Sequence, residues 1–199
     1  MNSSIIRAQD CPPQPWKNGL GTTREIAVYP SVASSDDFLW RVSIAEVDSA
    51  APFSSFPGID RHIALLDGAG FTMTLDDGRI HALTTPFAPF AFAGEAKVAV
   101  TLTDGPTRDF NLMVRRAQAR GEVKVWQQSG SYPLDPAIVL VYAVLGEIDT
   151  DAGTLRAGDA WLAGAPVAGR VTLRDGALAF VIGIQRTAGR TPILAASMP

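Results

Sequence analysis

The sequence predicts an all-β protein built as two β-barrels in one chain, with little helix. Short apolar segments alternate with glycine-containing turns along the whole chain, and no stretch of residues 1–116 keeps an apolar period of 3.6. The pattern T-L-T-D-G at 101–105 returns as T-L-R-D-G at 172–176, each time before an apolar strand that contains Phe. Two such copies indicate a double β-barrel or double sandwich, with its halves at 1–120 and 121–199 packed as one structural unit.

The composition fits a packed globular protein in a reducing compartment. The 199 residues are 47% hydrophobic and 19% charged, with a formal net charge of -3 and no basic patch, so we expect no nucleic-acid partner. Cys11 is the one cysteine, which excludes a disulfide framework. Residues 1–15 lack the apolar core of a signal peptide, and the longest apolar run, 138–145, is too short to cross a bilayer. We expect a cytoplasmic protein without a membrane partner.

The first segment of the chain is an extended lead-in followed by a turn and a strand. Prolines at 12, 13 and 15 forbid a helix. Asn18-Gly19 is a turn signal, and residues 23–28 alternate as a short strand that Pro30 ends.

The next strand, W-R-V-S-I-A at 40–45, places polar residues among apolar ones. Alternation puts Arg41 and Ser43 on one face, opposite three apolar side chains. Either Arg41 extends to solvent from a sheet edge, or it lines a cavity and meets an anion. The loop at 52–60 follows, and its Phe and Pro residues make it too apolar for a solvated connector.

The rest of the chain continues the strand-and-turn pattern. The Phe- and Pro-rich stretch 86–92 reads as an edge or inner-wall strand. Further strands are expected at 63–66, 71–75, 97–102, 110–114, 141–146 and 155–162. The inward candidates of the second barrel are mostly hydrophobic, so we expect its interior to be filled by side chains.

The residues that usually carry chemistry are few. The segment L-R-A-G-D-A at 155–160 resembles turn-and-strand segments of cupin barrels, which commonly hold a metal. Such a site needs several imidazoles and a carboxylate, but the chain has only His62 and His81, so we expect no metal and no cofactor. The sequence holds no G-x-S-x-G nucleophile motif and no G-x-G-x-x-G dinucleotide motif. We therefore assign no catalytic residue.

A set of polar residues remains inside otherwise apolar strands. Glu25 fits a structural ion pair with Arg24 or Arg41, and the pair of arginines at 115–116 fits a solvated strand end. The functional alternative is a barrel mouth or cavity lined by cationic groups, amide donors and aromatic walls. Such a pocket suits a small carboxylate or planar ligand.

Four ordered motifs give the chain a specific resemblance: W-K-N-G-L-G-T-T-R-E-I, L-W-R-V-S-I-A-E-V, P-F-S-S-F-P-G-I-D-R and T-R-D-F-N-L-M-V-R-R. They resemble the HutD family, which includes the Ves proteins, over most of residues 16–116. The first motif departs from the family's frequent N-G-G-G by its Leu20. The resemblance implies a cupin-like double-barrel fold and an association with histidine utilisation. It places the shared ligand-binding set on Trp16, Lys17, Asn18, Glu25, Arg41, Ser43, Arg61, Asp109 and Asn111.

Three functions stay open at this level. The first is a non-catalytic protein that binds a small carboxylate and tunes histidine utilisation. The second is a metal-independent isomerase or lyase acting on a small acid, with Glu25 as general base. The third is a protein-interaction module that uses a barrel edge or the segment 86–92. We expect binding rather than catalysis, with the ligand in the first half, and the sequence leaves a homodimer open.

Overall fold

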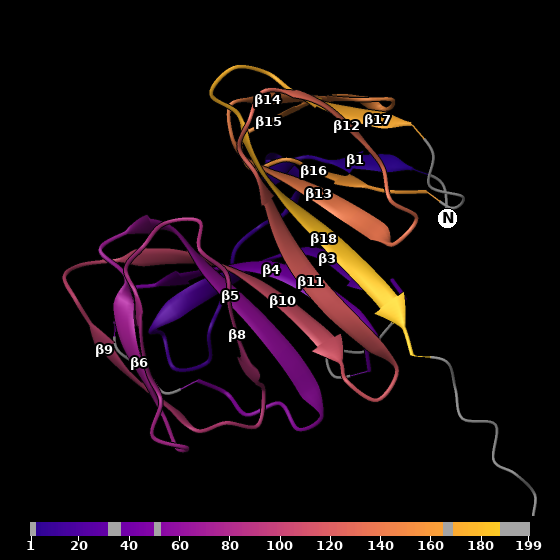
Figure 1. Ribbon diagram of the computed structural model, residues 1–199. Helices are drawn as coiled ribbons and strands as arrows, with labels where there is room; N and C mark the ends of the chain where they lie inside the picture. The colour runs from indigo at the N-terminus through magenta and orange to yellow at the C-terminus, as the bar shows by residue number, and fades with distance from the viewer. Residues whose placement is uncertain (1–2, 32–36, 50–52, 165–168, 188–199) are drawn as a thin grey trace, which may run out of the picture.

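The computed structural model describes residues 3–31, 37–49, 53–164 and 169–187. Apart from one short 3-10 helix, η1 (Ala8–Asp10), every element in these ranges is a β-strand (Figure 1). The prediction of an all-β protein with little helix is therefore confirmed. In the part of the chain that the structure describes, no helix is long and apolar enough to cross a membrane.

The strands form two large and two small antiparallel sheets. The first large sheet has the order β2 (Gln14–Pro15), β3 (Gly21–Tyr29), β4 (Trp40–Val47), β10 (Thr107–Arg115), β5 (Ile59–Gly68) and β8 (Phe90–Ala93). The first small sheet has the order β7 (Ile80–Leu83), β6 (Phe71–Leu75) and β9 (Val98–Leu102). Together they make the first half of the molecule.

The second half repeats this arrangement. The second large sheet has the order β1 (Ser4–Ile6), β16 (Ala160–Leu162), β13 (Ile138–Leu145), β18 (Leu178–Arg186) and β11 (Ala119–Trp126). The second small sheet has the order β12 (Gly130–Pro133), β17 (Arg170–Leu173), β14 (Glu147–Thr150) and β15 (Gly153–Arg156). The repeated T-L-x-D-G pattern ends β9 and β17, and the strands that follow, β10 and β18, both lie inside a large sheet.

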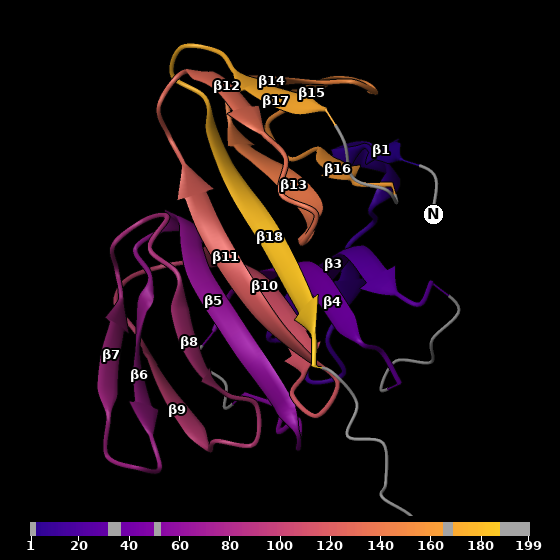
Figure 2. The same cartoon turned by 45° about the vertical axis from the view of Figure 1, so that its right-hand side comes forward.

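The two large sheets pack face to face and bury the central core of the molecule. Phe110 of β10 lies edge to face with Phe180 of β18, with ring centroids 5.0 Å apart. Strands β5, β10, β11 and β18 run side by side where the halves meet (Figure 2). At Gly121 of β11 an added Cβ would come within 2.5 Å of Val114, so glycine permits this close approach. The halves therefore share one apolar core.

Each half also has its own interior between its large and small sheets. In the first half Ile63 and Leu65 pack against Phe71 and Met73, and in the second half an apolar cluster that includes Trp161 fills the space. None of the four sheets closes into a barrel. The edge strands explain this, because β8 pairs only with β5 in its sheet, and β7 and β9 each pair only with β6. Each half is thus an open pair of sheets.

The N-terminal strand joins the second half although the residues after it build the first. In β1, Ile5 lies opposite Trp161 of β16, and β1 is drawn beside β16 in Figure 1. The turn between β10 and β11 lies at 116–118, close to the expected boundary at residue 120. The division into 1–120 and 121–199 stays a prediction, and the place of β1 shows that the sheets do not follow it strictly.

Candidate functional site

Neighbouring strands of the first large sheet bring distant polar residues onto its inner face, which is the face turned toward the first small sheet. Ser43 of β4 lies opposite Asn111 of β10 and, on its other side, opposite Glu25 of β3. Arg41 and Arg61 lie opposite the same residue of β10, Met113. Alternation predicted the faces of β4 correctly, because its apolar residues at 40, 42 and 44 lie in the central core.

The inner-face cluster consists of the polar residues on this face: Glu25, Arg41, Ser43, Arg61, Asp109 and Asn111. Arg61 is its most buried cation, with an exposed fraction of 6%. Its Nη2 donates to the side-chain oxygen of Asn111 at 2.8 Å. The guanidinium carbon lies 4.9 Å from the ring centroid of Phe53, 5.0 Å from Phe92 and 5.7 Å from Phe56. Aromatic faces attract a cation, and the attraction grows when water is excluded. The Nε of Arg61 nevertheless has no hydrogen-bond partner.

Asp109 is the buried acid of the cluster, with an exposed fraction of 1%. Its Oδ1 accepts a hydrogen bond from Asn111, whereas its Oδ2 is buried without a partner. Burial raises the pKa of Asp109 from 3.8 to about 7, against the opposing effects of Asn111 and Arg61. Burial also lowers the pKa of Arg61 to about 10, with Asp109 opposing and Arg41 adding to the decrease. Asn111 therefore links two charged groups that are both incompletely satisfied.

Arg41 and Glu25 lie nearer to solvent. Arg41 Nε is 2.9 Å from a carboxylate oxygen of Glu25, which confirms the predicted ion pair. The contact is an ion pair without a hydrogen bond, since the buried Nε of Arg41 has no hydrogen-bond partner. The Glu25 side chain is 48% exposed. Arg24, the other candidate partner of Glu25, pairs instead with Glu46 at 3.2 Å.

Three predicted site residues of the first motif, Trp16, Lys17 and Asn18, lie in the turn before β3. Trp16 Nε1 donates to the hydroxyl of Thr23 at 2.7 Å, and Thr23 lies opposite Ala45, on the row that contains Asp109. Asn18 accepts from the backbone N–H of Leu20 at 3.1 Å, so its side chain stabilises the turn. Lys17 is exposed. Trp16 therefore bonds a residue on the row of Asp109, and among the described residues no hydrogen bond or ion pair joins Trp16, Lys17 or Asn18 to the inner-face cluster itself.

The sequence-based set omitted the aromatic residues around Arg61. Phe53 and Phe56 come from the loop before β5, and Phe92 lies opposite Arg61 on β8. The apolar character of that loop was the available signal, but only the folded structure shows that its rings lie against the guanidinium of Arg61.

The two histidines do not come together. His62 lies opposite Leu112 on the face of β5 turned away from Arg61, and burial lowers its pKa. His81 of β7 stacks on Phe90 with ring centroids 3.7 Å apart. In the described ranges no three His, Cys, Asp or Glu side chains are grouped so that they could hold a metal ion.

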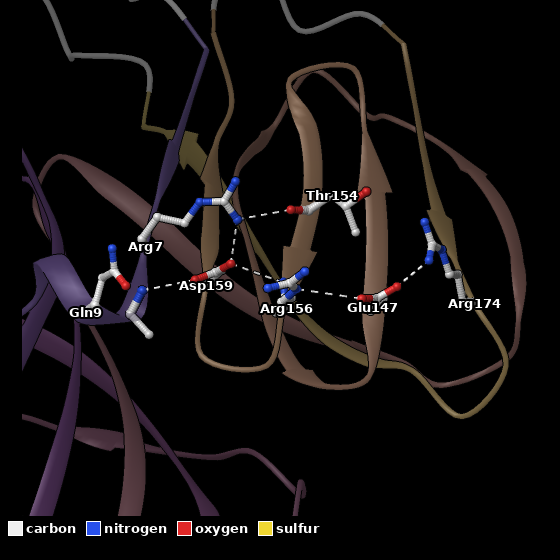
Figure 3. Close-up of a pocket in the computed structure, with 8 residues that line it drawn as sticks. Arg7, Gln9, Glu147, Thr154, Arg156, Asp159 and Arg174 are labelled. Atoms are coloured by element: carbon white, nitrogen blue, oxygen red, sulfur yellow. Dashed lines mark hydrogen bonds and ion pairs between the residues drawn. The ribbon is translucent and has the colours of Figure 1, made fainter.

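A hollow of about 710 Å³ in the second half holds other charged residues (Figure 3). Its charged groups contact one another, since Arg7 donates to Asp159 at 2.7 Å and Arg174 pairs with Glu147. Asp159 also accepts from the backbone N–H groups of Ala8 at 3.0 Å and Arg156 at 3.1 Å. Asp159 therefore fixes the N-terminal segment to the second half. Arg61 and Asp109 each keep a buried atom without a hydrogen-bond partner, so the inner-face cluster is the better candidate for the carboxylate site.

The fold of the described residues resembles that of cupin-like β proteins. A cupin 2 conserved barrel domain protein from Leptotrichia buccalis matches with a TM-score of 0.57 over 92% of this chain and 96% of its own, at 10% identity, a likeness of fold alone. The HutD family model matches residues 8–180, and the chain belongs to the HutD family.

Relatives in that family share sequence as well as fold. A structure of HutD from Pseudomonas fluorescens SBW25 has a TM-score of 0.81 and 31% identity, covering 94% of this chain and 100% of its own. A 21.2 kDa uncharacterised protein in the hutC 3' region of Pseudomonas putida is 37% identical over 73% of this chain and 75% of its own length. Protein Ves of Cronobacter sakazakii is 46% identical over 55% of this chain and 59% of its own.

Proposed function

We propose that this HutD-family chain binds a small carboxylate on the inner face of its first large sheet, without catalysing a reaction. The observation that carries the proposal is the buried Arg61, whose Nε has no partner although phenylalanine rings surround the guanidinium. A buried charge without full hydrogen bonding is costly. A carboxylate would offset this cost by accepting from Arg61.

The neighbouring groups define the class of ligand. Arg41 supplies a second cation, whose Nε is paired with Glu25 by charge but has no hydrogen-bond partner. Ser43 adds a buried hydroxyl on the row between the two arginines and Asp109. The rings of Phe53 and Phe92 favour a flat body beside the carboxylate. Asp109, when protonated, would donate to a carboxylate oxygen rather than repel it. The ligand we propose is therefore a small planar acid.

The family relationship suggests the physiological setting. Because the Pseudomonas putida relative is named for its place beside hutC, we propose that the chain tunes histidine utilisation by sensing a carboxylate of that pathway. We also propose that each open sheet pair corresponds to one barrel of a double-barrel cupin fold.

The two other functions have less support. Glu25, the base of the alternative lyase or isomerase, is half-exposed and held beside Arg41, whereas general bases are usually tuned by burial. Two side chains of the segment at 86–92 have internal contacts, because Phe90 stacks on His81 and Phe92 lies against Arg61. Both observations favour ligand binding in the first half.

Calorimetric titration with formate, urocanate, formylglutamate and glutamate tests the proposal. The Arg41→Ala variant should weaken binding by about 2–5 kcal/mol, the range for truncating one partner of a buried charge pair. The Arg61→Lys variant should also weaken binding, because lysine keeps the charge but lacks the planar donors of the guanidinium. Arg79→Ala is the matched control, because Arg79 pairs with Asp77 on an exposed turn. Unchanged affinity in a folded Arg61→Lys variant would show that the site lies elsewhere, and turnover of any of these acids would establish an enzyme instead.

A further inference from the structure

A second hollow, of about 490 Å³, opens between the two large sheets at one end of the central core. Its apolar lining includes Ile44 and Leu66 from the first large sheet and Tyr142 and Val144 from β13. The side chains of β4 and β5 that line it point away from Arg61, so this interlayer cleft is separate from the inner-face cluster. Its volume is in the range of small-molecule sites.

The rim of the interlayer cleft carries charges of alternating sign. Glu46, Arg108 and Asp67 lie opposite one another in a row across β4, β10 and β5. Arg108 pairs with Asp67 at 3.1 Å, and Arg24 pairs with Glu46 at 3.2 Å. All four side chains are between 32% and 59% exposed, so a ligand can reach them. The rim thus offers two cations and two anions and has no net charge.

Phe87 forms an aromatic wall of the interlayer cleft and has an unusual backbone. Its φ is 63°, and it is the only non-glycine residue in the described ranges with a positive φ. Its N–H donates to the carbonyl of Leu65 at 2.9 Å, which fixes this conformation. Residues other than glycine rarely adopt such angles, and those that do are concentrated at ligand clamps and active sites. The strain here holds an aromatic ring beside the charged rim.

We propose that the interlayer cleft binds a zwitterion with an apolar side group, of the class of free α-amino acids with an aromatic or branched side chain. The ligand's ammonium would meet Glu46 or Asp67 and its carboxylate Arg24 or Arg108, while its side group packs between Phe87 and the apolar floor. A simple anion would also meet the two rim carboxylates, and a simple cation the two arginines. Complementary charge therefore selects a ligand that carries both signs.

Titration of the wild-type protein with three matched probes tests the charge requirement without any mutation. We expect L-phenylalanine to bind saturably, as followed by amide chemical shifts. Phenethylamine lacks the carboxylate and 3-phenylpropionate lacks the ammonium, so each should bind about tenfold more weakly, the loss expected for one ion pair of about 1.4 kcal/mol. Equal affinity for the three probes, or no saturable binding of phenylalanine, would overturn the proposal.

Variants then locate the site. Arg108→Gln and Glu46→Gln should each weaken phenylalanine binding about tenfold, and both positions are exposed enough to tolerate an amide. Arg79→Gln, the same change at an exposed pair elsewhere, should leave it unchanged. Arg61→Lys should also leave it unchanged, which separates this site from the carboxylate site. If Arg61→Lys weakens phenylalanine binding and Arg108→Gln does not, the ligand occupies the inner-face cluster and the interlayer cleft is not its site.

Discussion

Replacing Asp109 by Asn should remove a pH-dependent loss of stability. In the folded chain the pKa of Asp109 is raised from 3.8 to about 7 because burial disfavours the carboxylate. A difference of about three in pKa corresponds to about 4 kcal/mol, since each unit is worth about 1.4 kcal/mol. Because the folded pKa is the higher one, this cost is absent below the unfolded pKa and complete above the folded pKa.

The measurable part of the effect lies in the neutral range. From these two pKa values, about 2 kcal/mol of the cost develops between about pH 5.5 and pH 8. Over that interval the free energy of unfolding of Asp109→Asn should rise by about 2 kcal/mol relative to the wild type. The lowered pKa of His62 gives an opposite slope in this range, but it acts in both proteins and cancels in the difference.

Urea unfolding at several pH values, read by the two-state method, gives the required free energies. Asp104→Asn is the matched control, because Asp104 lies exposed on the turn after β9. Its profile should run parallel to that of the wild type. If the Asp109→Asn profile is also parallel, the Asp109 carboxylate is ionised without penalty in the folded state and the reasoning about its burial fails.

Two further predictions concern the stability of the fold, at the N-terminal segment and in the central core. Asp159→Asn should lower the free energy of unfolding at pH 7 by about 1–3 kcal/mol, because an amide cannot accept all the hydrogen bonds that the carboxylate receives. The pKa of Asp159 is lowered in the folded state, so the difference between the variant and the wild type in urea unfolding should shrink as the pH falls below about 4. Leu112→Ala should lower the free energy of unfolding by about 2–5 kcal/mol in the same assay, because Leu112 is fully buried in the central core and the shorter side chain leaves a cavity. A smaller loss would mean that the two large sheets move together and fill that cavity.

Local alternation accounts for the part of the site that the sequence predicted. In β4 each side chain alternates between the central core and the inner face, so Arg41 and Ser43 could be assigned to one face from the pattern alone. Charge alone gave Glu25 an ion-pair partner but left Arg24 and Arg41 as alternatives, and the structure shows that the partner is Arg41. Such inferences need only neighbouring strands and a period of two.

Alternation along a strand does not predict contacts between residues that lie far apart in the sequence. Asn111 links Asp109 to Arg61, but Arg61 lies 50 residues away in the chain, and only the register of β5 against β10 joins them. A shift of one residue would turn Arg61 into the central core. Likewise, Lys17 and Asn18 resemble site residues by motif, yet their placement depends on a turn that no periodicity describes.

The pairing of β1 with β16 has a consequence for synthesis of the chain on the ribosome. Strand β1 is translated early, but its partner, beginning at Ala160, is translated about 150 residues later. At about 5–20 residues per second, this leaves roughly 8–30 seconds in which β1 has no native strand to pair with. During that time the first half can form its sheets, whereas the edge of the second large sheet cannot form until β16 has been made and can pair with β1. The nascent N-terminal segment is thus the stretch in which a chaperone or a neighbouring chain has longest access to an unpaired strand.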